Sequence, residues 1–363
     1  MVLEAFNEPL VKREIVIPAL ERGQVLVKLS ASGVCGSDVH QWKGEDPRIP
    51  LPLIPGHEGV GTVVETVGEK LTVDGKPLEA GDSIIWNRGV VCRACRFCTV
   101  LGEPSLCPNR RVYGISIPAD EPPYLNGCYA DYIILREGTD VFHADTGIDP
   151  AVLVPASCSG ATVAHAFDML DGTLAGATVV VQGPGPLGLF AAAFAREYGA
   201  SEVVMIGGTP GRLALAEEFG AGVVLNRRET TVEERREAVL SLTSGRGADI
   251  VIEATGAHGA AIEGIRLLRR GGTFLTTGYS QPVGTEEVDF YRDIVLKNAI
   301  VRGVWVSDTR HLAMAVALVS KHPALFGKLV THRLPLERAG EALGIVDRRE
   351  ALKAVLTFGT VVP

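Results

Sequence analysis

Three residues that could hold a metal ion lie far apart in the sequence, each in a short turn motif rich in glycine or serine. They are Cys35 in GVCGSDVH, His57 in PGHEGVG and Cys158 in PASCSG. Two thiolates and one imidazole suit a catalytic zinc ion, which keeps its fourth position open. Glu58 directly follows the histidine and adds a spare carboxylate. These residues predict a catalytic zinc site.

A second group of cysteines lies between these ligands and is close together in sequence. Its spacing is C-x2-C-x2-C-x8-C, formed by Cys92, Cys95, Cys98 and Cys107. Four thiolates can close a tetrahedral zinc site without an open position, which is the structural type. Such a site carries a formal charge of about −2. We expect four nearby arginines to offset it, Arg93, Arg96, Arg110 and Arg111.

Disulfides and an iron–sulfur cluster are the alternatives for these cysteines. The N-terminal stretch MVLEAFNEPLVKREI carries charges and no apolar signal segment, so we expect a reducing, cytoplasmic location, which argues against disulfides. In ferredoxins the last gap is three residues, whereas here it is eight. Zinc is therefore the preferred reading. Cys128 in NGCYADY has no partner, and we expect an inert, packed thiol.

Length and composition limit the class of protein. A chain of 363 residues with 46% hydrophobic content supports about two domains with sizeable cores. Its net charge of −8 disfavours nucleic acid and anionic membrane surfaces as partners. The longest uncharged run, 172–195, contains GPGPLG, whose prolines would break a membrane-spanning helix. We expect no membrane partner.

Hydrophobic patterning divides the chain into three regions. In the first 155 residues, strand-like runs such as QVLVKLSASGV, EGVGTVVETVG, DSIIW and ADYIIL are bounded by Gly, Pro or Asp. From about residue 160, buried strands alternate with amphipathic helices, from TVVVQ to TFLTTGY, which is typical of a doubly wound parallel sheet. After about residue 303, strand-like runs partly return in LVTHRLPL and AVLTFGTVVP. The pattern predicts an α/β fold.

The motif GPGPLG at 183–188 follows a β-branched run and opens an alanine-rich helix. In a βαβ unit, this context favours a dinucleotide-binding turn over a bare turn. We expect Gly183 to make the tight turn, Gly185 to let the pyrophosphate approach the backbone, and Gly188 to let helix and sheet pack closely. Pro186 and Leu187 complete the predicted cofactor-binding turn.

These motifs together resemble the zinc-containing medium-chain alcohol and polyol dehydrogenases over nearly the whole chain. GVCGSDVH, GHEGVGTVVETVG, the four-cysteine loop, GPGPLG, VIEATG and HRLPLERAGEAL occur in the family's order. The resemblance implies a GroES-like catalytic domain at 1–157 and 304–363, with a Rossmann domain at 158–303 inserted between these segments, and an active site in the interdomain cleft. The last gap of the cysteine loop is one residue longer than is usual in this family.

The resemblance also implies an activity. A zinc ion held by two thiolates and an imidazole would let a bound alcohol lose its proton near neutral pH. Hydride would then pass from the carbinol carbon to the nicotinamide of NAD(P). The implied substrate is a small alcohol or ketone, with a secondary alcohol or polyol the best guess, and the implied assembly is a homodimer or homotetramer.

Roles for residues near the zinc follow from the same resemblance, each with a simpler alternative. Ser37 would take the alcohol proton, or cap a helix starting at Asp38. His40 would pass the proton to solvent, or lie at the surface. Asp38 would orient His57, or cap the helix, and Glu58 would approach zinc only during ligand exchange. Four further residues fall in segments that line the substrate pocket in similar enzymes: Trp42, Trp86, Asn87 and Arg88.

The predicted choice of coenzyme depends on an acidic residue that this sequence lacks. The end of the second Rossmann strand, where an Asp or Glu binds the ribose of NAD and repels the 2′-phosphate of NADP, is Gly207. Thr209 and Arg212 follow and could hold that phosphate, although Arg212 could instead pack over the adenosine. The sequence leans slightly towards NADP. The resemblance also places Thr255 and Gly278 at the cofactor.

Two other classes of protein share this fold. Zinc-free quinone or enone reductases reduce C=C bonds and lack the ligands found here at Cys35, His57 and Cys158. A non-catalytic relative would bind the dinucleotide without turnover. Metal content and one activity assay would separate these alternatives.

Overall fold

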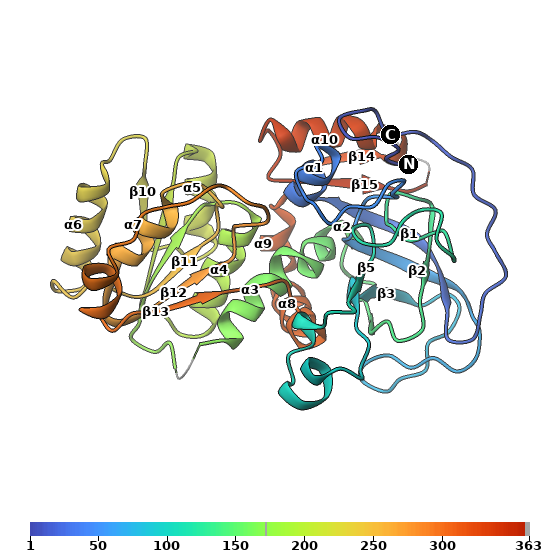
Figure 1. Ribbon diagram of the computed structural model, residues 1–363, viewed down its shortest axis with the longest axis horizontal. Helices are drawn as coiled ribbons and strands as arrows, with labels where there is room; N and C mark the ends of the chain where they lie inside the picture. The colour runs from blue at the N-terminus through green and yellow to red at the C-terminus, as the bar shows by residue number, and fades with distance from the viewer. Residues whose placement is uncertain (171–172, 360–363) are drawn as a thin grey trace. The chain divides into compact units, whose positions relative to one another are not determined.

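Two segments that are far apart in the sequence build the first of two compact units (Figure 1). The computed structural model describes residues 1–170 and 173–359. The first unit contains Met1–Ala161 and the chain from Ser307 onward, and the second contains Thr162–Val306. The first boundary falls four residues later than expected, within helix α3 (Ser159–Asp168), and the second falls three residues later than expected. Cys158 therefore belongs to the first unit rather than to the inserted one.

The main sheet of the first unit is mostly antiparallel. Its described strands follow the order β14-β15-β1-β2-β3-β7, and β6 also pairs with β1. Among these described strands, only β14 and β15 pair in parallel. The bounds are β1 (Val25–Val34), β2 (Gly59–Thr66), β3 (Ser83–Trp86), β6 (Tyr132–Leu135), β7 (Val141–His143), β14 (Val330–Pro335) and β15 (Lys353–Thr357). Because β15 pairs with β1, the C-terminal segment lies beside the first metal-ligand turn.

Shorter elements complete the first unit. Strands β4 (Gly89–Val90) and β5 (Arg111–Val112) form a small separate pair. The helices are α1 (Gly36–Trp42), α2 (Pro150–Leu153), α8 (Thr309–Lys321), α9 (Pro323–Gly327) and α10 (Ala339–Asp347). The single-turn elements are η1 (Phe97–Leu101), η2 (Pro104–Leu106), η3 (Val154–Ser157) and η5 (Leu336–Arg338). The region after residue 303 is thus more helical than its strand-like runs suggest.

The second unit is a parallel sheet with alternating helices, as the hydrophobic pattern predicts (Figure 1). Its described strands follow the order β10-β9-β8-β11-β12-β13. The strands are β8 (Thr178–Gln182), β9 (Glu202–Gly207), β10 (Val223–Asn226), β11 (Ala248–Glu253), β12 (Leu268–Thr276) and β13 (Ile300–Gly303). The helical elements are α4 (Pro186–Glu197), α5 (Pro210–Glu218), α6 (Val232–Leu242), α7 (Ala260–Leu267) and η4 (Phe290–Val295). The strand order is that of a doubly wound, dinucleotide-binding fold, which confirms the predicted fold class.

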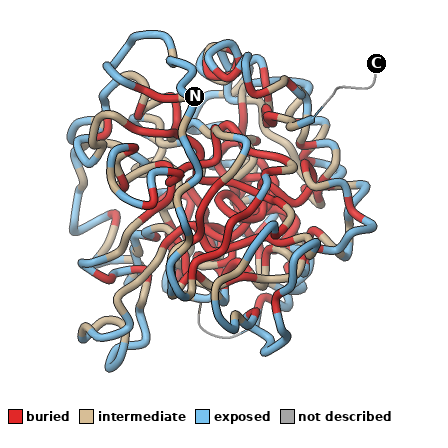
Figure 2. Tube along the Cα trace, turned by 90° about the vertical axis from the view of Figure 1, so that its right-hand side faces the viewer, coloured by how far each residue is buried: buried red, intermediate tan, exposed pale blue. Residues whose placement is uncertain are grey.

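Buried stretches of the chain run through the interior, and exposed stretches lie mainly at the periphery (Figure 2). Buried apolar side chains line most strands of both units, whereas β10 is half-buried and β13 is mostly exposed. In the first unit, two clusters pack around β1, one with Leu26 and Leu356 and the other with Val27 and Ile133. In the second unit, Val180, Val204 and Val251 of adjacent strands pack with Ile265 of α7 and other residues. Burial of β8 along its whole length explains why TVVVQ reads as a continuous apolar run.

No single helix in the described residues is long and apolar enough to cross a membrane, although one bent pair, Pro150–Ser157 with Ser159–Asp168, meets the length and composition criteria together. The uncharged run that begins at residue 172 forms β8, a turn and the start of α4. Residue 172 itself and residues 360–363 of the run AVLTFGTVVP lie outside the described residues.

Candidate metal centres and cofactor site

The predicted catalytic zinc ligands come together in the first unit. Cys35 lies between β1 and α1, His57 precedes β2, and Cys158 follows η3. One ligand atom from each of these residues, and one from Glu58, all lie within 4.8 Å of one another. Three separate turns thus place two thiols, an imidazole and a carboxylate around one point.

The His57 ring is oriented as a metal ligand requires. Its Nδ1 lies 3.0 Å from Asp38 Oδ1, whereas its buried Nε2 has no hydrogen-bond partner among the described residues. Burial alone would lower the pKa of His57, but the charge and hydrogen bond of Asp38 raise it to about 9. Asp38 pairs with Nδ1, so Nε2 is the nitrogen left for a metal ion, and it must lose its proton when the metal binds.

Asp38 combines both roles considered for it. One carboxylate oxygen faces His57, and the other accepts a hydrogen bond from the backbone N–H of Cys35 at 2.8 Å. Helix α1 begins at Gly36 with Cys35 as its N-cap. The alternative that Ser37 caps a helix starting at Asp38 is therefore wrong, because the helix begins earlier. The two carboxylate oxygens of Asp38 thus link the start of α1 to the imidazole of His57.

The surroundings of the two thiols favour a thiolate at Cys158 and a neutral thiol at Cys35. A hydrogen bond with Cys35 is the main cause that lowers the pKa of Cys158, with a further contribution from the charge of Arg88, against the effect of burial. The same hydrogen bond, together with burial, raises the pKa of Cys35 well above its ordinary value. Arg88 is only 5% exposed, and its Nε has no hydrogen-bond partner among the described residues. Arg88 thus lies beside the zinc-ligand cluster as a buried cation.

Glu58 forms an ion pair with Lys353, a residue that the sequence analysis did not identify. Lys353 Nζ of β15 lies 2.9 and 2.8 Å from the two carboxylate oxygens of Glu58. Both side chains are buried, 2% and 0% exposed. Burial would lower the pKa of Lys353, but the charge of Glu58 raises it above its ordinary value. Motif spacing carries no signal for this lysine, since 295 residues separate the partners.

The two residues expected to move the proton both lie on α1. Ser37 Oγ lies 3.9 Å from Cys35 Sγ. His40 Nδ1 lies 2.6 Å from Glu45 Oε2, and the imidazole is 30% exposed. His40 therefore has one ring nitrogen paired with a surface carboxylate.

The four cysteines of the second group also converge. Their sulfurs lie 3.5 Å (Cys92–Cys107), 3.6 Å (Cys95–Cys98) and 3.8 Å (Cys95–Cys107) apart. A backbone hydrogen bond from Ala94 is the first of several that lower the pKa of Cys92 to about 6. The longer last gap is taken up by η1 and η2. The donor set fits a closed zinc site.

The surrounding arginines do not all act as expected. Arg93 pairs with Asp140 at 2.6 Å, and Arg111 pairs with Glu121 at 2.5 Å. The expectation that all four arginines offset the thiolate charge is therefore wrong for these two, because each has a carboxylate partner. Backbone N–H groups approach the sulfurs directly, with Cys95 N 3.4 Å from Cys92 Sγ. Cys128 lies apart from both clusters, and burial raises its pKa well above the ordinary value, as expected for an inert thiol.

The glycine-rich turn leaves room for a dinucleotide. Gly183 has φ +104°, a left-handed conformation that favours glycine. A Cβ on Gly188 of α4 would lie 1.8 Å from the Gly183 carbonyl oxygen, so helix and turn are in direct contact. A Cβ on Gly185 would meet nothing within 4 Å. The backbone before α4 is thus open to an incoming phosphate, beside Pro186 at the helix start.

A single buried carboxylate joins Thr255 and Gly278, which resemblance assigned to the cofactor. Glu253 at the end of β11 is 0% exposed. Its Oε1 accepts hydrogen bonds from the Thr255 and Gly256 backbone N–H groups at 2.6 and 2.7 Å, and its Oε2 accepts one from the Gly278 N–H at 3.2 Å. Glu253 therefore fixes two turns at the carboxyl ends of adjacent strands, where ligands bind in such sheets.

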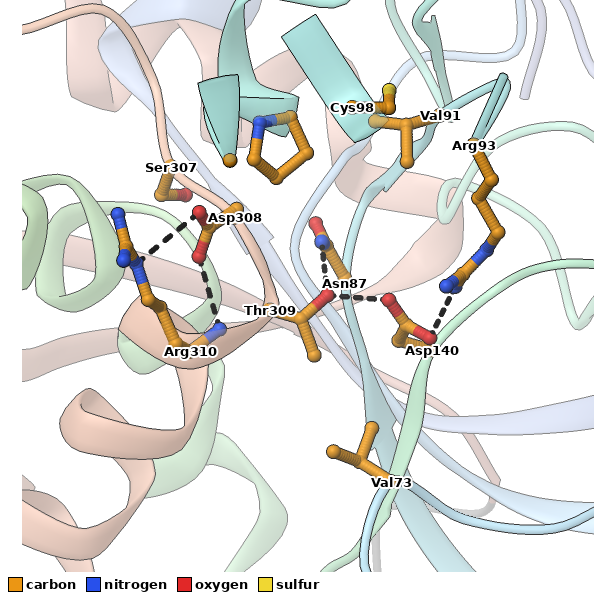
Figure 3. A pocket seen from close by; sticks show the side chains of 12 residues that line it. Val73, Asn87, Val91, Arg93, Cys98, Asp140, Ser307, Asp308, Thr309 and Arg310 are labelled. Atoms are coloured by element: carbon orange, nitrogen blue, oxygen red, sulfur yellow. Dashed lines mark hydrogen bonds and ion pairs between the residues drawn. The ribbon is translucent and has the colours of Figure 1, made fainter. Parts of the chain in front are cut away.

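The residues considered for the substrate pocket have different surroundings. Trp86 is 2% exposed and belongs to an apolar core cluster, so its side chain packs inside the first unit. Trp42 donates to the Glu8 carbonyl oxygen at 2.8 Å. Asn87 Nδ2 donates to Thr309 Oγ1 at 3.0 Å, in the wall of a cavity of about 620 Å³ (Figure 3).

The charges in this cavity are balanced by one another. Asp140 faces Arg93 on one side and the Thr309 hydroxyl on the other, and Asp308 faces Arg310 (Figure 3). Its wall includes Cys98 but none of the predicted catalytic residues. The cavity is therefore separate from the candidate catalytic centre.

Comparison with known proteins agrees with this geometry. An alcohol dehydrogenase GroES-like domain matches residues 21–145, and a zinc-binding dehydrogenase matches residues 186–321. The 5-exo-hydroxycamphor dehydrogenase of Pseudomonas putida is 33% identical over 340 residues, which cover 92% of this chain and 91% of that protein. An alcohol dehydrogenase structure from Thermotoga maritima is 52% identical, with a TM-score of 0.96 and 98% coverage of both chains. A putative zinc-binding dehydrogenase from Sinorhizobium meliloti, bound to NADP, is 25% identical, with a TM-score of 0.85 and 98% coverage of both chains.

Fold, ligand cluster and relatives together define a class of enzyme, an oxidoreductase that acts on alcohols with zinc and a nicotinamide dinucleotide. The chain belongs to the zinc-containing medium-chain alcohol and polyol dehydrogenase family.

Proposed function

We propose that this enzyme oxidises a secondary alcohol or polyol, and reduces the corresponding ketone, with one catalytic and one structural zinc ion per chain. The observation that carries the proposal is the cluster of Cys35, His57 and Cys158, in which the buried Nε2 of His57 has no hydrogen-bond partner within the described ranges. A zinc ion bound there would act as a Lewis acid that lowers the pKa of an alcohol at its open position.

The residues around this cluster have separate proposed roles. Asp38 holds the imidazole of His57 in the ligating tautomer. Ser37 Oγ accepts the alcohol proton, and His40 passes it to solvent. The pair of Glu58 and Lys353 keeps a carboxylate next to the ligands without making it a permanent ligand. Cys92, Cys95, Cys98 and Cys107 hold the structural zinc.

The proposed substrate class follows from the relatives and the site. The relative from Pseudomonas putida is named for hydroxycamphor, in which the alcohol is secondary. The three assembled ligands favour alcohol chemistry over the zinc-free reduction of C=C bonds. We propose a small-molecule alcohol as substrate and a homodimer or homotetramer as assembly.

The proposed coenzyme is NADP. Gly207 carries no carboxylate to repel a 2′-phosphate, and Thr209 at the N-cap of α5 makes no capping hydrogen bond through its side chain. The relative from Sinorhizobium meliloti is described as bound to NADP. Arg212 lies in the first turn of α5. Thr209 and Arg212 are therefore candidates for contact with the adenosine end.

One experiment tests the activity and another tests the coenzyme. Purified protein is analysed for zinc and incubated with a panel of primary, secondary and polyhydroxy alcohols, with NADP⁺ or NAD⁺, while formation of the reduced coenzyme is followed. We expect about two zinc ions per chain and turnover of a secondary alcohol. Zinc-free protein with full activity would refute the proposal. A kcat/KM that clearly favours NAD⁺ would refute the coenzyme assignment alone.

A further inference from the structure

The carboxyl end of β9 cannot readily hold the acidic residue that selects NAD. A Cβ on Gly207 would lie 2.5 Å from Pro184 Cδ and 2.9 Å from Leu213 Cδ2. Pro184 is part of the glycine-rich turn, and its ring is rigid. A side chain at 207 would therefore force the turn or α5 to move. The close packing of the turn therefore disfavours a carboxylate side chain at position 207.

Two arginines lie beside the next residue along the backbone. A Cβ on Gly208 would lie 3.2 Å from Arg227 Nε and 3.3 Å from Arg228 Nε. Both arginines directly follow β10, which pairs in parallel with β9 so that Asn226 lies opposite Gly207. The Arg227 backbone N–H also donates to the Gly207 carbonyl oxygen at 2.7 Å. The position of the two arginines is therefore set by the register of the sheet.

The two guanidinium groups have no counter-charge in the part of the chain that the structure describes. Both residues are exposed, and no hydrogen bond or ion pair of either side chain is found there. The acid nearest in sequence, Glu229, accepts a hydrogen bond from Asn226 Nδ2 at 2.6 Å. Two neighbouring cations beside a bare glycine backbone form a site that an anion would stabilise.

The N-terminus of helix α5 lies at the same carboxyl end of β9. Helix α5 begins at Pro210, directly after Gly208 and Thr209, and runs for nine residues. The side chain of its N-cap, Thr209, makes no capping hydrogen bond. Helix N-termini favour anions through their free N–H groups and their dipole. The hydroxyl, the helix terminus and the two arginines are thus close together at the end of β9.

We propose that Arg227 and Arg228 bind the 2′-phosphate of NADP and are the principal determinants of coenzyme choice, an inference that rests on the proposed dehydrogenase function. In doubly wound sheets, the adenosine ribose lies at the carboxyl end of the second strand, which here is β9. Guanidinium groups match phosphate oxygens in geometry and charge. Because Gly208 has no side chain, it does not cover the side of Arg227 and Arg228 that faces the backbone after β9.

The test measures binding of adenosine fragments, so it does not depend on turnover. Isothermal titration calorimetry compares 2′,5′-ADP with ADP, which lacks the 2′-phosphate. The proteins are the wild type, Arg227→Gln, Arg228→Gln, the double variant, and Arg246→Gln as a control. Arg246 is also exposed, but it precedes β11. Because the strands are parallel, it lies at their amino ends, whereas the proposed site lies at the carboxyl end of β9.

We expect the wild type to bind 2′,5′-ADP more tightly than ADP. Each single variant should weaken 2′,5′-ADP binding about tenfold, as for loss of one charge-assisted hydrogen bond. The double variant should lose about a hundredfold, with ADP binding changed less than about twofold. Arg246→Gln should change neither ligand, because it removes the same charge far from the proposed site.

A carboxylate at Gly208 gives an independent test. The three atoms nearest to a Cβ at position 208 all belong to the flexible side chains of Arg227 and Arg228, so the fold should tolerate Gly208→Asp. It should pair with both arginines and abolish the preference for 2′,5′-ADP. Wild-type affinity that is equal for the two ligands would overturn the proposal, as would variants that weaken both ligands equally.

The fragment results also separate this inference from the proposed function. If the wild type oxidises alcohols with NAD⁺ and shows no 2′-phosphate preference, the arginine site is wrong and the dehydrogenase function stands. If neither ADP nor 2′,5′-ADP binds and neither coenzyme supports turnover, both proposals fail.

Discussion

Glu58 and Lys353 form a buried ion pair across 295 residues of sequence, with Lys353 Nζ 2.9 and 2.8 Å from the two carboxylate oxygens. Glu58 also contributes to the cluster of candidate zinc ligands. The lysine belongs to β15, which pairs with β1 directly before the Cys35 turn. The C-terminal strand thus delivers the counter-charge for a carboxylate that the N-terminal segment places beside two thiols.

Loss of Lys353 should destabilise the first unit. In Lys353→Met, Glu58 is left buried without a partner, which typically costs about 3–5 kcal/mol. The double variant Lys353→Met, Glu58→Gln removes both charges and should recover much of this loss. Urea unfolding of the metal-loaded proteins measures both values. Equal stabilities of the single variant and the wild type would show that the pair is not coupled in solution.

The two cysteine groups should respond differently to substitution. Cys92→Ser removes one of four ligands of the closed site and should lower folding yield and thermal stability, because structural zinc contributes directly to folding. Cys35→Ser should leave a folded chain without measurable turnover. Zinc analysis should give about two ions in the wild type and about one in folded Cys35→Ser. Full activity of Cys35→Ser would contradict the ligand assignment.

Ser37→Ala should slow alcohol oxidation while coenzyme affinity stays nearly unchanged. Loss of a group that transfers a proton typically lowers kcat on the order of 100-fold or more, and it removes no contact with the dinucleotide. His40→Ala should have a smaller effect, since His40 is partly exposed and pairs with Glu45. Steady-state kinetics from acid to neutral pH, with coenzyme binding measured separately, checks both variants. Unchanged turnover of Ser37→Ala would remove the proposed relay.

Two glycines of the same turn should separate folding from coenzyme binding. In Gly188→Ala, the new Cβ would lie 1.8 Å from the Gly183 carbonyl oxygen, so we expect a loss of about 1–3 kcal/mol in stability. In Gly185→Ala, the Cβ meets no protein atom within 4 Å, so stability should hold while coenzyme affinity falls. Thermal unfolding and fluorescence titration with NADPH distinguish the two. Wild-type affinity in Gly185→Ala would argue against close approach of the pyrophosphate there.

The local features of this protein could be predicted from its sequence. The strand before GPGPLG, the helix after it and the parallel sheet follow from hydrophobic periods and turn residues, which act over a few neighbouring positions. The candidate ligands Cys35, His57 and Cys158 were identifiable because each lies in its own turn motif. Coordination chemistry restricts which residue types can share a zinc ion, so three separate motifs predicted one cluster.

The contacts that depend on strand pairing could be established only from the tertiary structure. Lys353 reaches Glu58 because β15 lies beside β1, and Arg227 and Arg228 reach Gly208 because β10 lies beside β9. Trp86, which the sequence suggested for the substrate pocket, packs in a core because β3 turns its ring inward onto Gly59 of β2. Such contacts join residues far apart in the chain, and their register is set by burial of whole strand faces rather than by any local motif.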